Sequence, residues 1–565
     1  AMESLAGELE ARFYEAEDAG CAVDSVALFR EVVAGSVGRC IRSDKELWPQ
    51  TGLPSEPTRL ALLHSAAQNR LGELSVDDAL EAGFPTTTID CAPVRAAVGH
   101  FEAALVAWPG NASAAYSLGQ IFRDRGEGDR ALALFAQIET LAASGGPSND
   151  EQDSLHRWRE CWIFEPRRSA VAVAILHLAL LYSQRAQHAA AAPLLRRFGF
   201  KLRLSPHVWA AAAAAPPPAL AATCARPVRM FPSCVPEYLG KQLTRAFAPG
   251  AAYWRETGYH NASAEKNYFT FFFDVESQPT NAVEALISHL RPLAETGKKL
   301  VCAEWWVHTR LAGVHPGHEL HYDCEEGVME ASGEVLHPLV SSVVYLAGDE
   351  SAGPTIVLDQ RLDSKPARRC WLAHPRSRAF MTFPGELLHG VLPAARATPP
   401  PSQPQRLQAA EPAERTLKRG ADLPAEAAFE KSFEKGQHRL TLMIAWYGVD
   451  AREKSSKRGR HSLRPQGAVP RASRRVTWPR ELELDQVALR TQAPADPGRE
   501  MDVVEVGSAW EPVPEPAVVP RVQVKLLQVP AHLDLFFFQK SHADVRERLW
   551  REHGLGGTWA RPGAD

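Results

Sequence analysis

One segment of the sequence, HTRLAGVHPGHELHYDCEEG, carries a high density of side chains that can bind metals. Within sixteen positions it holds four histidines and an aspartate, which are His308, His315, His318, His321 and Asp323. Imidazole nitrogens and carboxylate oxygens are common protein ligands of iron and zinc. A helical metal site is not expected, because the Pro-Gly pair that precedes His318 disfavours a helix. We expect His315 and His318 to be loop residues at the rim of a pocket.

His321 and Asp323 have a spacing that suits a strand. Residues two apart on a β-strand project to the same face, so the imidazole and the carboxylate would lie side by side. Together they would supply two of the three ligands of a 2-His-1-carboxylate site for non-haem Fe(II). Taken alone, the His-x-Asp pair also fits a hydrogen-bonded pair at the surface. A metal site therefore requires a third ligand from a later strand.

Two later segments supply that ligand and a basic residue. His389 follows a Pro-Gly turn in FMTFPGELLHGVLP, and Arg439 and Thr441 alternate in the strand-like segment HRLTLMIAWYG. A guanidinium on the inner face of a sheet favours a carboxylate partner, which it binds through two parallel hydrogen bonds. The chain order is therefore histidine and aspartate, then histidine, then arginine.

This order resembles that of the 2-oxoglutarate/Fe(II)-dependent dioxygenases, especially the prolyl-4-hydroxylase-like group. YLAGDESAGPTIVL and LLHGVLP are also similar to that group's sequences, and the resemblance covers about residues 228–450. One spacing differs, because the family's basic residue follows the distal histidine closely, whereas Arg439 lies 50 residues after His389. The Pro-, Ala- and charge-rich residues 395–435 account for the difference if they form a surface insert, since long loops cost little extra entropy.

The resemblance implies a reaction and a role for each residue. Iron and 2-oxoglutarate would together oxidise a C–H bond of a substrate, and ascorbate is a further candidate cofactor. The implied Fe(II) ligands, which are also the catalytic residues, are His321, Asp323 and His389. The implied contacts to 2-oxoglutarate are Arg439, Thr441 and Tyr345, and a packed core tyrosine is the alternative for Tyr345.

The N-terminal part of the sequence predicts helices. At 565 residues the chain should contain more than one domain, and residues 1–205 show the apolar periodicity of α-helices. Ala97 and Ala131, like Phe101 and Phe135, are 34 residues apart, which is the period of tetratricopeptide repeats. We predict an all-α, tetratricopeptide-like repeat domain that binds a peptide or protein, with a generic helical bundle as the alternative.

The rest of the chain predicts a β-rich double-stranded β-helix, or jelly roll, because short aromatic and β-branched runs follow one another without intervening helices. The predicted organisation after the repeats is an Ala/Pro linker over 206–228, the oxygenase domain over 229–450 with its insert at 395–435, a basic and Pro-rich linker over 451–510, and C-terminal strands with a helix near 542–553 over 511–565.

The composition is that of an ordinary globular protein. Hydrophobic residues make up 45% and charged residues 23%, and the formal net charge is −4, which argues against a protein that coats nucleic acid. Nine scattered cysteines indicate reduced thiols and an intracellular location, cytoplasmic or nuclear. No apolar run reaches the length of a transmembrane helix, so no membrane association is expected.

The substrate is open on sequence grounds. Helical repeats beside this catalytic domain favour hydroxylation of a protein or peptide side chain. The basic residues 452–475 keep open the oxidation of a nucleic-acid base, although a solvated loop or a localisation signal explains them more simply. A non-enzymatic repeat scaffold with a degenerate jelly roll is the third hypothesis, and the intact set of ligands argues against it.

Overall fold

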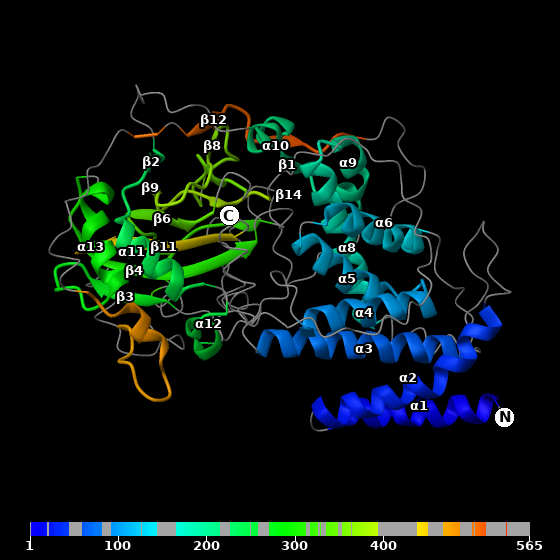
Figure 1. Ribbon diagram of the computed structural model, residues 1–565. Coiled ribbons are helices and arrows are strands. Elements are labelled where there is room, and N and C mark those ends of the chain that lie inside the picture. Colours follow the sequence, from blue (N-terminus) through cyan, green and yellow to red (C-terminus); the bar gives the residue numbers. More distant parts are fainter. Residues whose placement is uncertain are drawn as a thin grey trace. The chain divides into compact units, whose positions relative to one another are not determined.

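Figure 1 shows the computed structural model, in which the chain forms two compact units. The first comprises residues 1–182, 190–198 and 518–534, and the second comprises residues 183–189, 199–517 and 535–565. The structure describes residues 2–19, 22–44, 59–81, 92–125, 127–143, 165–214, 227–248, 250–257, 270–295, 297–311, 317–325, 328, 335–348, 353–362, 364–393, 438–449, 467–485, 500–501, 503–515 and 538–539.

The first unit is helical where the structure describes it. Successive helices α1 to α6 lie side by side as a stack of neighbours (Figure 1). The helices are α1 (Met2–Asp18), α2 (Ala22–Asp44), α3 (Arg59–Glu81), α4 (Ala92–Ala107), α5 (Ala112–Asp124), α6 (Gly128–Ala143), α8 (Glu165–Gln184) and α9 (His188–Arg197), with the α8–α9 turn assigned to the second unit.

A contact between a glycine and an aromatic ring recurs in this helical unit. Phe101 on α4 and Phe135 on α6 are both fully buried. Each ring lies against a glycine of the preceding helix, since a Cβ added at Gly72 or at Gly119 would lie 2.6 Å from Phe101 or Phe135, respectively. The predicted helical character is confirmed, and the assignment as tetratricopeptide repeats stays a prediction.

The Gly119 contact can be tested by adding one methyl group. In Gly119→Ala the new Cβ collides with Phe135, and such overpacking costs about 1–3 kcal/mol. In Gly99→Ala, on α4, the Cβ meets nothing within 4 Å, so the variant should gain the roughly 0.5–1 kcal/mol by which alanine exceeds glycine in a helix. Denaturant unfolding of the full chain should therefore shift in opposite directions, and equal shifts would contradict the close approach.

The second unit is built on two antiparallel sheets. The six-stranded sheet has the order β2-β9-β6-β11-β4-β3, and the five-stranded sheet has the order β12-β8-β7-β10-β5. The strands are β2 (Arg229–Phe231), β3 (Phe271–Asp274), β4 (Leu300–Leu311), β5 (His318–His321), β6 (Val340–Ala347), β7 (Thr355–Leu358), β8 (Cys370–Ala373), β9 (Phe380–Pro384), β10 (His389–Val391), β11 (His438–Gly448) and β12 (Val504–Val506). A small third sheet has the order β13-β1-β14, formed by β1 (Leu202–Leu204), β13 (Trp510–Pro512) and β14 (Phe538–Gln539).

The two large sheets share a hydrophobic core. Val343 and Met381 of the six-stranded sheet belong to the same buried cluster as Val357 and Trp371 of the five-stranded sheet. The two sheets therefore pack face to face, as antiparallel sheets with one buried inner face do.

The alternation along β11 separates that inner face from an outer one. Leu440, Leu442 and Ile444 join a core cluster that also contains residues of α11 (Glu237–Ala246) and α13 (Ala282–Ala294). Figure 1 shows both helices beside this sheet. Because successive side chains alternate in a strand, Arg439 and Thr441 point to the opposite, inner face.

Parts of the sequence-based organisation need correction. The expectation of strands without intervening helices was wrong, because α11, α12 (Ala252–Thr257) and α13 lie within residues 229–450. Their apolar residues recur every three or four positions and cover the outer face of the six-stranded sheet. We also expected a linker over 206–228, whereas α10 (Pro206–Ala213) forms at its start, where alanines favour a helix and Trp209 is buried.

The predicted basic linker over 451–510 also contains ordered structure. Its short helix η2 (Trp478–Leu482) buries Trp478, and β12 pairs with β8. The insert at 395–435, the helix near 542–553 and the strand-like VQVKLLQVP all lie outside the described residues.

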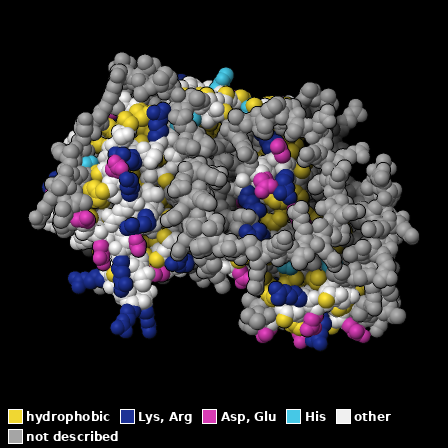
Figure 2. Space-filling model, viewed as in Figure 1, with side chains coloured by type: hydrophobic (Ala, Val, Ile, Leu, Met, Phe, Trp, Pro, Cys, Tyr) yellow, Lys and Arg dark blue, Asp and Glu magenta, His cyan; other side chains and the backbone are white. Residues whose placement is uncertain are grey.

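The arginines in the described part of the basic segment 452–475 are exposed. Arg471, Arg474 and Arg475 belong to the loop that precedes η2, and Figure 2 shows Lys and Arg side chains projecting at the lower left, where Figure 1 draws this loop. Separately, none of the described helices combines the length and the apolar character needed to cross a membrane.

Candidate metal centre

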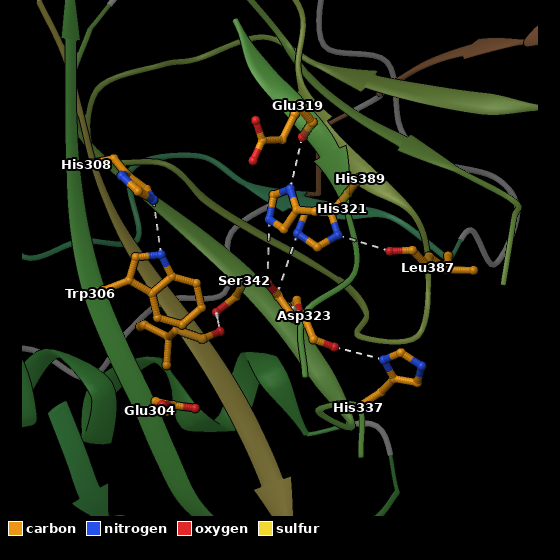
Figure 3. Close-up of polar contacts among 12 residues, drawn as sticks. Glu304, Trp306, His308, Glu319, His321, Asp323, His337, Ser342, Leu387 and His389 are labelled. Atoms are coloured by element: carbon orange, nitrogen blue, oxygen red, sulfur yellow. Dashed lines mark hydrogen bonds and ion pairs between the residues drawn. The ribbon is translucent and has the colours of Figure 1, made fainter. Parts of the chain in front are cut away.

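The three predicted metal ligands come together on neighbouring strands. His321 ends β5 and lies opposite His389 of β10 in the antiparallel register, and Asp323 follows β5 by two residues. Asp323 Oδ1 lies 3.7 Å from His321 Nε2, and Asp323 Oδ2 lies 3.5 Å from His389 Nε2. One ligand atom from each residue falls within 4.8 Å of the others, so the three side chains converge on one point (Figure 3).

Backbone carbonyls orient both imidazole rings. His321 Nδ1 lies 2.9 Å from Glu319 O, and His389 Nδ1 lies 3.0 Å from Leu387 O. A carbonyl oxygen can only accept, so each Nδ1 carries the proton and donates it. The lone pair of each Nε2 then points towards Asp323, as Figure 3 shows for both rings. This is the tautomer in which a histidine binds a metal through Nε2.

Asp323 is fixed through its side chain and its backbone. The Ser341 hydroxyl donates to Asp323 Oδ2 at 2.5 Å, and His337 Nδ1 donates to the Asp323 carbonyl oxygen at 2.8 Å. Ser341 lies on β6, in the sheet opposite the two histidines. The carboxylate is therefore held between elements of both sheets.

The electrostatics of the cluster favour an ionised carboxylate. Burial would raise the pKa of Asp323, but His389, His321 and the Ser341 hydroxyl together hold the pKa well below its usual range. Burial also opposes the charged form of His389, yet the Asp323 carboxylate raises the pKa of this imidazole above its ordinary 6.5.

Metal affinity should therefore depend on pH with a defined sign. A metal binds only the neutral imidazole, so protons compete for His389 below its raised pKa. Asp323 stays ionised in that range because its pKa is depressed. Titrations with Mn(II) should show an apparent affinity that rises with pH through the His389 pKa and levels off above it. An affinity that stays constant on the acidic side of neutrality would contradict this coupling.

The residues present fit a divalent transition metal. His389 Nε2 is buried and makes no hydrogen bond within the described part of the chain, and a buried nitrogen lone pair without a donor is costly. Two imidazole nitrogens and one carboxylate oxygen match the set that binds non-haem Fe(II). Ligands at right angles on a metal about 2.1 Å away lie roughly 3 Å apart, so small inward movements complete the site.

Two further histidines lie beside the cluster but not in it. A β-bulge in the pairing of β5 with β10 puts His318 opposite Val391, and the His318 ring lies 4.8 Å from that of His321. His308 of β4 lies 5.3 Å from the His318 ring, and its Nε2 accepts a hydrogen bond from Trp306 Nε1 at 3.1 Å. The expectation that His318 is a loop residue was wrong, because it begins β5, and His315 lies outside the described residues.

Arg439 is a buried cation with neutral hydrogen-bond partners. Its side chain donates to Gly353 O at 2.5 Å and to Thr355 Oγ1 at 2.7 Å, and its guanidinium lies 5.3 Å from the Tyr345 ring centre. Among the described residues no carboxylate pairs with it. Burial lowers the pKa of this guanidinium, because the charged form loses its hydration and gains no carboxylate partner among the described residues. An anionic ligand would offset that cost.

The strand register places Arg439 near the metal ligands. Thr355, its hydrogen-bond partner, lies two residues from Val357 on β7, and Val357 is directly opposite His389. Thr355 and His389 therefore project from the same face of the five-stranded sheet, at strand positions roughly 7 Å apart.

The other two predicted co-substrate contacts surround this arginine. The Tyr345 hydroxyl lies 2.8 Å from Thr355 Oγ1, and its side chain is fully buried in the core between the sheets, as the alternative interpretation expects. Thr441 is buried and lies opposite Tyr345 in the register of β11 with β6. Arg439, Tyr345 and Thr441 thus lie on neighbouring strands of the six-stranded sheet.

Sequence reasoning missed three supporting residues. Ser341, His337 and Thr355 hold Asp323 and Arg439, but each lies far from its partner in the chain. For Ser341 and Thr355 the signal was a hydroxyl side chain inside an apolar strand, in LVSSVVYL and PTIVL. Such residues need a hydrogen-bond partner when they are buried.

Comparisons with known proteins give limited information. No family model and no curated protein matches the chain. Among solved structures, the chain is similar to HygX from Streptomyces hygroscopicus, whose structure has nickel and 2-oxoglutarate bound. The likeness has 12% sequence identity and a TM-score of 0.20, and it covers 40% of this chain and 83% of HygX. A similarity of that size supports no functional conclusion, which must come from the residues themselves.

Proposed function

We propose that the chain is an Fe(II)- and 2-oxoglutarate-dependent dioxygenase with a jelly-roll domain of the prolyl-4-hydroxylase-like kind. The observation that supports this most directly is the convergence of His321, Asp323 and His389, with both Nε2 lone pairs directed at the carboxylate. The buried Arg439 favours 2-oxoglutarate as the co-substrate, because its guanidinium can bind a carboxylate close to the metal ligands.

Each residue then has a defined task. His321, Asp323 and His389 would hold Fe(II) through three ligands and leave other positions open, and Arg439 would bind the distal carboxylate of 2-oxoglutarate. Iron and 2-oxoglutarate, when bound, supply the oxidising chemistry that inserts an oxygen atom from O₂ into a C–H bond. The protein contributes orientation and a buried setting, in which Thr355 and Gly353 O keep the guanidinium in place.

We propose a protein or peptide side chain as the substrate. The helical unit supports this choice, because stacked helix pairs commonly offer a surface to peptide partners. Oxidation of a nucleic-acid base is the alternative outcome, and it predicts substrate binding that weakens steeply with salt.

The proposal is tested by binding and turnover with the full chain. Under anaerobic conditions the protein should bind one Fe(II), and 2-oxoglutarate should then bind to the iron-loaded form. In air the loaded protein should slowly convert 2-oxoglutarate to succinate even without substrate. A chain that binds no divalent metal, or binds iron but neither binds nor converts 2-oxoglutarate, would overturn the proposed activity.

A further inference from the structure

Two adjacent serines interrupt the apolar strand β6, and they face opposite ways. Ser341 and Ser342 are each only 1% exposed. Ser342 Oγ donates to Ile444 O at 3.0 Å and accepts from Trp446 Nε1 at 2.8 Å. Ser341 Oγ instead donates to Asp323 Oδ2. One serine thus serves the packing of the sheet, and the other contacts a candidate metal ligand.

We propose that Ser341 is a positioning residue for the metal centre, which acts by holding the Asp323 carboxylate in the orientation that a divalent metal requires. The inference rests on the proposed metal site and adds a residue to it. Ser341 lies on the sheet opposite the two histidines, so it holds the third ligand from the other side of the site.

The geometry shows what the hydroxyl does. Asp323 Oδ1 faces His321 and Oδ2 faces His389, at 3.7 and 3.5 Å. The Ser341 hydroxyl donates to Oδ2, so it fixes the position of this oxygen relative to β6. His337 Nδ1 donates to the Asp323 carbonyl oxygen at 2.8 Å and so restrains the backbone at this residue.

The energetic consequence follows from preorganisation. Without the hydroxyl, the carboxylate can rotate about its side-chain bonds, and this freedom is lost again when the metal binds. Groups that are hydrogen-bonded to metal ligands typically change metal affinity by about 10- to 100-fold. Loss of Ser341 Oγ should therefore weaken the metal without removing a ligand.

The test is a titration of the full-length apoprotein with Co(II), followed by its visible absorption spectrum. Ser341→Ala should bind Co(II) about 10- to 100-fold more weakly than wild type and show an altered spectrum. Ser341→Thr keeps a hydroxyl at this position, so it should recover most of the affinity. If the alanine variant fails to fold, Ser341→Thr carries the test alone: a folded threonine variant should keep Co(II) affinity within a few-fold of wild type, and a loss of about 10- to 100-fold in it would contradict the role given to the hydroxyl.

Ser342→Ala is the matched control, because it removes an equally buried hydroxyl from the same strand. It leaves Trp446 Nε1 without its partner, so it should lower the free energy of unfolding but leave Co(II) affinity and spectrum unchanged. Equal losses of Co(II) affinity in both alanine variants would reduce Ser341 to a structural role and overturn the inference. Wild-type affinity in Ser341→Ala would do the same while leaving the proposed function intact. A wild-type chain that binds no Co(II) would instead refute the metal site itself.

Discussion

Replacement of His389 by alanine is expected to abolish both metal binding and the conversion of 2-oxoglutarate to succinate. His389 is one of the three ligands that the described residues offer in the candidate site, and among those residues its buried Nε2 has no hydrogen-bond partner. Loss of a ligand should cost more than the roughly 10- to 100-fold in affinity caused by changes to groups that merely orient ligands. His321→Ala and Asp323→Ala should behave in the same way. Isothermal titration with Mn(II) and a succinate assay measure the two effects.

The control for this prediction is His318, whose ring lies only 4.8 Å from that of His321. His318→Ala removes an imidazole from the same strand and the same face, and it should retain metal binding. The pattern of losses therefore distinguishes the ligands from neighbouring histidines. If His318→Ala lost the metal while His321→Ala kept it, the ligand set would be wrong.

The sequence predicted the residues of the candidate site better than it predicted the elements around them. The His-x-Asp spacing predicted one strand face for both residues, whereas β5 ends at His321 and Asp323 lies two residues beyond it. Arg439 does lie in a strand, as its alternating segment predicted. The structure brings the three candidate ligands together and places Arg439 on the inner face, where it donates to Thr355 of the five-stranded sheet. Their roles as ligands and anchor stay predictions until binding is measured.

The helices, the position of His318 and the role of Ser341 could not be predicted from the sequence, because each depends on tertiary contacts. Helices α11 and α13 pack against the outer face of a sheet, and their short amphipathic segments are hard to distinguish from strands before that sheet is known. His318 reaches the same face as His321 only because of a bulge, and a bulge depends on the partner strand. Ser341 lies 18 residues from Asp323, and nothing local links the two.

Arg439→Ala should weaken 2-oxoglutarate binding strongly and leave metal binding in place. The guanidinium is buried, its described hydrogen-bond partners are a carbonyl and a hydroxyl, and Thr355 ties it to the face that carries His389. Removal of one partner of a buried charge pair costs about 2–5 kcal/mol. Titration of the Mn(II)-loaded protein with 2-oxoglutarate measures this loss, and Mn(II) affinity measured beforehand shows that the ligands are intact.

Two further variants distinguish the planar, two-point contact of the guanidinium from its charge alone, and binding from the stability of the fold. Arg439→Lys should recover only part of the affinity, because an ammonium group cannot form the planar, two-point contact with a carboxylate. Arg203→Ala removes another buried guanidinium of the same unit, one that already pairs with Glu511 at 2.6 Å. That variant should lower stability without changing 2-oxoglutarate affinity, because its carboxylate partner belongs to the chain. Wild-type affinity for 2-oxoglutarate in Arg439→Ala would assign the distal carboxylate to a different residue and leave the buried charge of Arg439 to be explained by packing alone.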